Sequence, residues 1–224
     1  LPALVGRLKK RSFIYIKERV LKKLQGWKEK LLSIAGREVL IKAVIQVIPT
    51  YTMSCFKLPR GLIKELEVLI RKFWWVYTED SRKVYWVSRE RLCEAKEVGG
   101  MGFKEIEKFN DALLSKQVWR MLHNSDSLCF RVFKARFFPN CSILDAKESN
   151  SGSYAWKSIL GARDVIKKGM VWCIRNGQTA RIKEDKWLPV KPSRVVLSPL
   201  PSVVAESKVS SLINHELSVW KSEE

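Results

Sequence analysis

Apolar and polar positions near the start of the chain alternate at helical spacing. The first apolar series is Phe13, Ile16, Val20 and Leu24. Steps of three and four residues place these side chains on one face, which predicts an amphipathic helix. The basic residues that fall on its opposite face are Arg19, Lys22 and Lys23. Gly26 is expected to end this helix, and Trp27 to follow on a short connector.

Two more helices are predicted before residue 76. The stretch 36–48 is apolar nearly all round, so this second helix should be largely buried. Its polar stripe consists of Glu38, Lys42 and Gln46, spaced four residues apart. Pro49 should kink or end it, and Pro59 should open a third helix over 61–75 with a wide apolar face. Three packed helices would make a small bundle.

The middle of the chain predicts a short strand, a tight turn and more helices. Residues 84–87 form a β-prone run. The glycines at 99, 100 and 102 predict a turn with positive φ angles. The helices predicted after this turn run from about 104 to 122, over 128–137 and over 154–167.

The last part of the chain predicts a hairpin and then a linker. Residues 171–182 are β-prone on both sides of Asn176-Gly177, the pair that a type I′ turn prefers. Residues 188–224 are rich in Pro and Ser. The predicted fold is therefore mainly α, a helical bundle plus a second helical region that carries a small β-hairpin. The predicted domains are 1–98, 99–187, and 188–224 as a linker with a short C-terminal segment.

Composition and charge narrow the partners. The 224 residues are 46% hydrophobic and include nine Trp and nine Phe, enough for a packed core. Lys and Arg number 42 against 23 Asp and Glu, a net charge of +19 that attracts polyanions. Ten of these cations lie in residues 1–30, beside two acidic residues. Nucleic acid is the leading partner, and an anionic membrane surface is the alternative.

No membrane span or leader is predicted. No apolar run reaches the length of about 20 residues that crosses a bilayer, and the first twelve residues lack the pattern of a signal peptide. We therefore expect a soluble intracellular chain without stable membrane insertion.

The residues that would carry catalysis or bind metal form no recognisable set. The five cysteines are odd in number, widely spaced and without a Cys-x-x-Cys pair, and the two histidines are too few for a His-based metal site. The acidic pairs Glu79-Asp80 and Glu184-Asp185 are typical of solvated turns. The Gly-rich run at 99–102 lacks the Lys-Ser/Thr of a phosphate loop. Neither a metal nor a cofactor is expected.

Arg37 and the tryptophans are the ambiguous residues. Arg37 falls among apolar positions of the second predicted helix, so its guanidinium must pair internally, reach solvent along the surface, or contact a phosphate. Extension to solvent and contact with a phosphate are expected about equally. Most tryptophans lie inside periodic apolar patterns and are expected in the core. Trp27, between Gly26 and Lys28, is the best candidate for stacking on a base.

Several motifs carry a resemblance that covers almost the whole chain. They are WKEKLLSIAGREVLIKAVIQVIPTYTMSCF at 27–56, the block at 59–75, GGMGF at 99–103, FNDALL at 109–114, KQ at 116–117 and SYAW at 153–156. In this order they resemble the region just downstream of the catalytic palm in reverse transcriptases of plant LINE-type (non-LTR) retroelements. Leu1-Pro2 resembles the end of the family's Tyr-Leu-Gly-Leu-Pro segment, which follows the paired catalytic aspartates. Gly36-Arg37 matches a Gly-Arg pair of the family and tips Arg37 slightly toward phosphate contact.

The resemblance implies nucleic-acid binding without catalysis. In the family this region is a helical thumb that holds the template-primer duplex by its backbone, followed by a helical region that leads to a zinc-binding domain. The thumb-like part maps onto about 11–90 and the following region onto 99–187. Neither the palm nor the zinc-binding domain is inside the chain, so we expect no enzyme activity unless a separate chain supplies the palm. Cys173, Arg175 and Lys183 depart from the family pattern around the predicted hairpin.

The leading hypothesis is a non-catalytic fragment of a retrotransposon RNA-directed DNA polymerase that binds RNA/DNA template-primer duplex, or another duplex, through phosphates and without sequence preference. The candidate binding residues are Lys9, Lys10, Arg11, Arg19, Lys22, Lys23, Trp27, Lys28, Arg37 and Lys42. The alternatives are an unselected retroelement relic without a biochemical role and a basic amphipathic module on anionic membrane. The family suggests the nucleus, and an organelle is also compatible.

Overall fold

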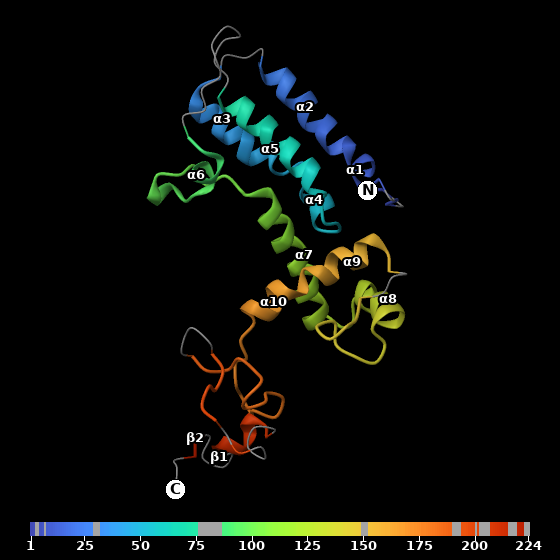
Figure 1. Ribbon diagram of the computed structural model, residues 1–224, viewed down its shortest axis with the longest axis vertical. Coiled ribbons are helices and arrows are strands. Elements are labelled where there is room, and N and C mark those ends of the chain that lie inside the picture. The colour runs from blue at the N-terminus through green and yellow to red at the C-terminus, as the bar shows by residue number, and fades with distance from the viewer. Residues whose placement is uncertain are drawn as a thin grey trace. The chain divides into compact units, whose positions relative to one another are not determined.

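A computed structural model describes residues 1–2, 5–6, 8–28, 32–75, 87–148, 152–189, 194–199, 201, 207–214 and 219–221. The chain forms two compact units, Leu1–Ile166 and Lys167–Glu224. It is mainly α-helical with one short antiparallel strand pair, which confirms the predicted fold class (Figure 1). The domain boundaries placed after residues 98 and 187 remain predictions.

The first amphipathic helix is present and longer than expected. It consists of the turn α1 (Lys9–Ser12) and the helix α2 (Ile14–Lys28). The predicted apolar face is confirmed, since Phe13, Ile16, Val20 and Leu24 are all at most 4% exposed. Full burial of such a side chain contributes about 1.5 to 3 kcal/mol.

The predicted end of this helix is wrong. Helix α2 continues through Gly26, and Trp27 lies in its last turn and not on a connector. The ring of Trp27 is half-buried and packs against Phe73, with 6.0 Å between centroids. Glycine inside a helix costs only about 1 kcal/mol relative to alanine, so packing of one large aromatic ring offsets it.

The second predicted helix is built from three pieces. Helix α3 (Ile34–Leu40) begins at Ser33, whose hydroxyl accepts a 3.1 Å hydrogen bond from the Gly36 N–H. It continues into a π-helical turn, η1 (Ile41–Ile45), and after Pro49 into the short helix α4 (Thr50–Met53). The predicted single helix over 36–48 is therefore corrected at both ends. The π-helical turn ends at Ile45, and Pro49 is the N-cap of α4, a position that donates no intrahelical N–H bond.

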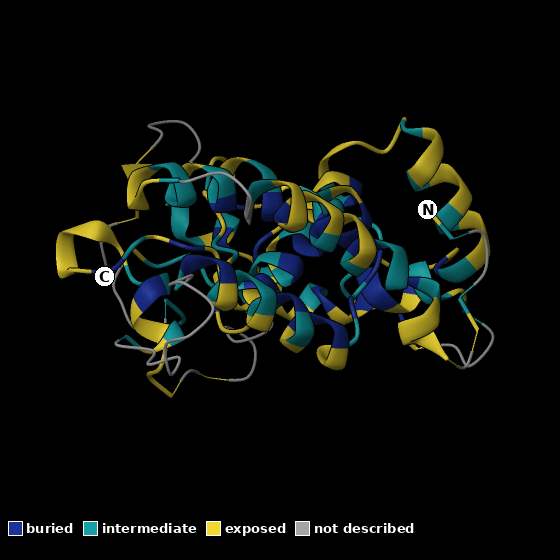
Figure 2. Ribbon diagram, turned by 90° about the horizontal axis from the view of Figure 1, so that it is seen from above, coloured by how far each residue is buried: buried dark blue, intermediate teal, exposed yellow. Residues whose placement is uncertain are grey.

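Burial of this segment differs from the prediction. Ile41 and Ile45 are buried, but Val39 and Val47 are 61% and 53% exposed. Helix α3 packs on α5 with one face and leaves Val39 exposed on another. Figure 2 shows the same pattern, with buried residues on the inner sides of the helices and exposed residues outside.

Helix α5 (Arg60–Trp74) follows Pro59 as predicted and lies beside α2 (Figure 1). Its buried side chains are Leu62, Ile63, Leu66, Phe73 and Trp74. Residues 76–86, which include the first three residues of the strand predicted over 84–87, lie outside the described residues. The chain returns in α6 (Arg89–Cys93) and a 3₁₀ turn, η2 (Lys96–Val98).

The glycine turn after η2 is confirmed. Gly99 and Gly102 have φ angles of +85° and +65°. Residues other than glycine rarely adopt this backbone conformation. Glycine is required at position 100 for a different reason. A Cβ there would lie 2.1 Å from the Glu94 carbonyl oxygen.

The helices that follow are α7 (Ile106–His123), α8 (Leu128–Phe137), α9 (Tyr154–Gly161) and α10 (Arg163–Gly169). The prediction for α8 is confirmed, and the helix predicted over 154–167 is divided at Ala162. Trp156 is fully buried and stacks on Phe137 and Phe138, at 4.8 and 5.5 Å between centroids. The core interpretation is therefore correct for Trp156.

The predicted hairpin over 171–182 is wrong. These residues form no strand pair with one another in the described part of the chain. The hairpin of the structure joins β1 (Ile213–Asn214) and β2 (Val219–Trp220). Gly177 has φ of +65°, but a Cβ on it would lie 2.5 Å from Ser210 N. Gly177 therefore allows a distant segment to approach and does not serve a local turn.

Part of the predicted linker is packed. Val209, in the 3₁₀ turn η3 (Val209–Leu212), is fully buried with Ala180 and Ile182. Residues 207–214 thus contribute to the core of the second unit. Among the helices that the structure describes, none is both long and apolar enough to cross a bilayer.

Candidate nucleic-acid interface

Arg19, Lys22 and Lys23 lie together on the outer face of α2. All three are exposed, as predicted, and the opposite face of the helix is fixed in the core. Side chains three and four residues apart on a helix are neighbours, with about 5 to 6 Å between their Cβ atoms. No ion pair joins these three cations to another residue in the described ranges. Their charge is therefore available to an external anion.

Lys9, Lys10 and Arg11 lie in α1 and are exposed. Lys10 pairs with Glu65 of α5, and Lys17 approaches the same carboxylate at 2.9 Å. Hydrogen bonds from Lys10 and Lys17 lower the pKa of Glu65.

Lys9 lies beside an aromatic ring. The Lys9 ammonium lies 4.8 Å from the ring centroid of Tyr154, a weak cation–π contact. Lys10 therefore ties α1 to α5, and Lys9 and Arg11 extend the cationic face of α2 toward the N-terminus.

Trp27 and Lys28 close α2. Trp27 packs on Phe73, so its ring is less available to a base than a connector residue would be. The side chain of Lys28 lies outside the described residues.

Arg37 pairs internally. It is half-buried, its Nε donates to the Leu32 carbonyl at 3.3 Å, and its Nη1 donates to the Trp74 carbonyl at 3.1 Å. The last carbonyls of a helix lack intrahelical donors and carry partial negative charge. Arg37 therefore caps the C-terminal end of α5. Sequence reasoning had considered internal pairing but favoured the surface and phosphate readings.

Lys42 is also engaged within the fold. Its ammonium lies 2.8 Å from a carboxylate oxygen of Glu38, and Lys96 lies 2.7 Å from the same oxygen. Hydrogen bonds from Lys42 and Lys96 lower the pKa of Glu38. Gln46, the third residue of the predicted polar stripe, is buried and its side-chain amide lies 3.5 Å from the Lys104 carbonyl. This stripe faces the segment around the glycine turn and not solvent.

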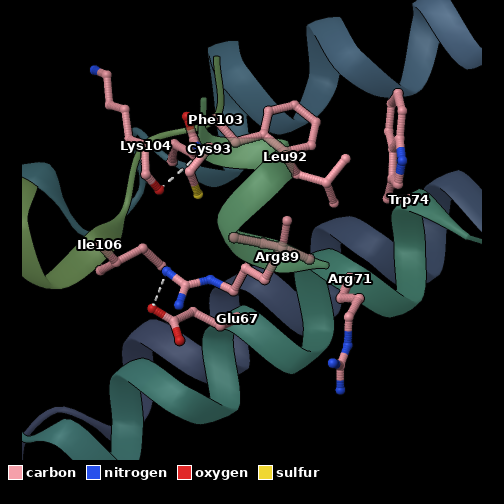
Figure 3. Close-up of a pocket in the computed structure, with 11 residues that line it drawn as sticks. Glu67, Arg71, Trp74, Arg89, Leu92, Cys93, Phe103, Lys104 and Ile106 are labelled. Carbon is pink, nitrogen blue, oxygen red and sulfur yellow. Dashed lines mark hydrogen bonds and ion pairs between the residues drawn. The ribbon is translucent and has the colours of Figure 1, made fainter. Parts of the chain in front are cut away.

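A small pocket lies beside this stripe (Figure 3). Arg89 and Glu67 point toward one another inside it, with 2.5 Å between Nη2 and Oε1. Burial raises the pKa of Glu67, against the opposing charge of Arg89, and burial also raises the pKa of Cys93. The volume of about 20 Å³ holds about one water molecule. This is far below the several hundred Å³ typical of small-molecule sites.

Asn110 is the residue whose role sequence reasoning missed. Its side chain is fully buried, its Oδ1 accepts from Leu58 N at 2.8 Å, and its Nδ2 donates to the carbonyls of Met53 and Phe56 at 2.8 and 3.0 Å. One side chain thus pairs a backbone group at the end of α4 and two in the loop between α4 and α5. The signal was present, because Asn110 lies four residues from Ile106 and from Leu114 in an otherwise apolar series.

Most tryptophans are expected in the core, but Trp119 is an exception, since it is 45% exposed on α7. Trp172 is also exposed, at 37%. Within the described ranges, no three His, Cys, Asp or Glu side chains gather as metal ligands would.

Comparison with known proteins places the chain among plant sequences. It is 36% identical over 196 residues to a protein of Arabidopsis thaliana provisionally named as ribonuclease H protein At1g65750, a match that covers 86% of this chain and 32% of that protein. The chain therefore spans about a third of the length of this relative. No protein-family model matches the chain, and no solved structure does.

A second relative has a different extent. It is 37% identical over 142 residues, 63% of this chain and 92% of the relative, which is the uncharacterized mitochondrial protein AtMg00310 of Arabidopsis thaliana. The match therefore covers almost all of that protein, at 37% sequence identity. The chain belongs to the same family as the uncharacterized mitochondrial protein AtMg00310.

Proposed function

We propose that this chain is a retroelement-derived piece of a plant reverse transcriptase, and that its thumb-like helices hold a nucleic-acid duplex by its phosphates. The observation that carries the proposal is the cationic face of α2, Arg19, Lys22 and Lys23, exposed on a helix whose other face is locked in the core. Resemblance of the motifs at 27–56, 99–103 and 109–114 to LINE-type enzymes supports the origin. The relative named for ribonuclease H, three times as long as the matched segment, is compatible with it.

A preformed row of cations suits this role. Contacts to phosphates position a protein on a duplex and carry no sequence information. The packing of α2 on α5 fixes the helix backbone from which the three side chains project, so only the side chains themselves have to be ordered when they bind. Lys9 and Arg11 extend the proposed surface. Arg37 and Lys42 support it from inside the bundle, through Trp74 and Glu38.

The proposed role is binding without catalysis. Polymerase chemistry uses clustered carboxylates that hold two metal ions about 4 Å apart, and the family's paired-aspartate element does not occur in the sequence. We expect the isolated chain to incorporate no nucleotide on a primed template with Mg²⁺ or Mn²⁺. Incorporation by protein free of contaminating polymerase contradicts this part of the proposal.

The membrane alternative fits the described geometry less well. An interfacial helix inserts its apolar face among lipids, but the apolar face of α2 is already buried against the rest of the first core. We propose a compartment that holds nucleic acid, and the mitochondrial relative favours an organelle over the nucleus.

The test measures affinity for an RNA/DNA hybrid of about 20 base pairs as a function of salt. Each phosphate neutralised on a duplex adds about 0.9 to the slope of log affinity against log salt. Replacing Arg19, Lys22 and Lys23 together by Gln should reduce this slope by roughly 2 to 3 units.

The matched control removes the same charge elsewhere in the first unit, as Arg131→Gln, Arg136→Gln and Lys147→Gln, all at exposed positions. The control should leave the slope almost unchanged. Equal effects of the two triple variants would mean that net charge, and not the α2 face, determines binding.

A further inference from the structure

The C-terminal half of α7 presents a mixed aromatic and cationic face. Its members are Lys116, Trp119, Arg120 and His123, spaced i, i+3, i+4 and i+7. All four are exposed, and the opposite side of the same turns is buried through Leu114, Val118 and Met121. We call these four residues the α7 face.

Trp119 and His123 make a two-ring surface. The ring centroids are 4.1 Å apart with 32° between the planes, and His123 Nδ1 lies 3.0 Å from the Trp119 carbonyl oxygen. This geometry holds the imidazole against the indole and fixes both rings on one rigid helix. Nearly half of the Trp119 side chain nevertheless remains open to solvent. An aromatic ring exposed in this way is suited to stack on another flat ring.

The charges around the rings are uncompensated. The acidic residues of α7 lie in its first half, where Asp111 pairs with Lys57 at 2.5 Å. In the described ranges no ion pair involves Lys116 or Arg120, and Arg120 Nη1 only contacts the Gln117 amide oxygen at 3.3 Å. Of the two cations, Arg120 lies in the last turn of α7, where a cation interacts favourably with the helix dipole by about 1 kcal/mol or less. That interaction accounts neither for Lys116 nor for an exposed tryptophan between the two cations.

We propose that the α7 face binds unpaired nucleotides of single-stranded RNA or DNA. Bases stack on Trp119 and His123, and Lys116 and Arg120 contact the adjoining phosphates. Single-stranded sites combine these two elements, a stacking platform and a cationic path for the backbone. In a duplex the bases are already stacked on one another, so this face discriminates in favour of unpaired strands. The site is distinct from the α2 face, which is proposed to hold duplex.

The experiment measures fluorescence anisotropy of a labelled oligo(dT) of about 12 nucleotides, a length within the range that single-strand sites cover. Trp119→Ala should weaken binding by about 5- to 150-fold, the range for loss of one stacked base. Trp119→Phe should restore most of the affinity, because a phenyl ring retains a stacking face. Lys116→Gln with Arg120→Gln should lower the salt slope by roughly 1 to 2 units, at about 0.7 per phosphate on a single strand.

The matched control is Trp172→Ala, which removes another exposed tryptophan outside the α7 face. It should leave oligo(dT) affinity unchanged. Thermal melts should show that Trp119→Ala is folded, because the side chain is not in the core. Equal binding by folded Trp119→Ala and by the original chain overturns the inference.

The same variant separates this site from the proposed duplex site. Duplex affinity should be insensitive to Trp119→Ala and sensitive to the triple substitution on α2. A chain that binds duplex but not oligo(dT) overturns the α7 face alone. Binding of oligo(dT) through Trp119 without any duplex binding supports the α7 face and contradicts the function proposed for α2.

Discussion

The guanidinium of Arg37 donates from Nη1 to the carbonyl oxygen of Trp74 at 3.1 Å, across 37 positions of sequence. The bond joins the last turn of α3 to the end of α5, and a second bond from Nε to the Leu32 carbonyl holds the side chain in place. Arg37 therefore links two helices of the bundle at the point where α5 exposes unpaired carbonyls.

Arg37→Met should lower the free energy of unfolding by about 1 to 3 kcal/mol, because a half-buried carbonyl loses a charged donor and methionine replaces only the apolar stem. Duplex affinity per folded molecule should be unchanged. Urea unfolding and salt-matched binding curves on the same preparation make the comparison. An unchanged unfolding curve with weakened duplex binding would restore the phosphate role for Arg37.

Asn110→Ala should destabilise the fold by about 3 kcal/mol or more, since each backbone group left unpaired in the core costs about 1 to 3 kcal/mol. Circular dichroism melts provide the measurement. The control is Asn124→Ala, at the exposed C-cap of the same helix, which should shift Tm by little. Similar shifts for the two variants would mean that water replaces the Asn110 amide.

Gly26→Ala should stabilise the chain by about 0.5 to 1 kcal/mol, because Gly26 lies inside α2 and alanine is the better helix former. Nothing lies within 4 Å of a Cβ added there. Gly100→Ala, which places its Cβ 2.1 Å from the Glu94 carbonyl, should instead destabilise the chain. Chemical denaturation compares the two variants. Loss of stability in Gly26→Ala would indicate that α2 ends at residue 26.

Glu38→Gln should flatten the loss of stability in acid. Hydrogen bonds from Lys42 and Lys96 lower the folded pKa of Glu38 below its ordinary value of 4.5. The unfolded state therefore binds the proton more tightly, so this stabilisation is present above about pH 4.5 and is lost as pH falls through the folded pKa. Urea unfolding from about pH 3 to 7 gives the profile. Glu97→Gln, at an exposed position in η2, is the control and should leave the profile unchanged.

Periodicity predicted the parts of the fold that depend on one helix alone. The buried series from Phe13 to Leu24 and the bounds of α8 follow from local spacing and caps. The end of α2 and the burial of Val39 depend on what packs from elsewhere, namely Phe73 on Trp27 and no described segment over Val39. A single sequence does not contain that information.

The hairpin prediction failed for a related reason. Asn176-Gly177 has the composition of a type I′ turn, and Gly177 does adopt positive φ. Its backbone is nevertheless placed against Ser210, thirty-three positions later, so a tertiary contact uses the residue that a local rule assigns to a turn. The β pairing forms instead between residues 213–214 and 219–220.

Some features of the candidate site could be predicted from the sequence and others could not. Exposure of Arg19, Lys22 and Lys23 could be read from the helical wheel, since it is the complement of the buried face. The internal partner of Arg37 could not, because Trp74 lies far along the chain. The pair of Lys42 with Glu38 has the i, i+4 spacing of the predicted polar stripe, but Lys96, which shares Glu38, lies far along the chain. The exposure of Trp119 could not be predicted from the periodicity that identified the core. A helix places residues of its buried and exposed faces within one apolar-rich stretch of sequence.

Asn110 also sets the order in which the first unit can be completed during synthesis. The ribosome releases α1 to α5 before α7. Until Asn110 emerges, Leu58 N and the carbonyls of Met53 and Phe56 lack the partner that they have in the finished fold. The early helices are therefore expected to remain a loosely closed intermediate, accessible to chaperones. Arrival of α7, which brings Asn110, is therefore expected to be the step that completes the first core.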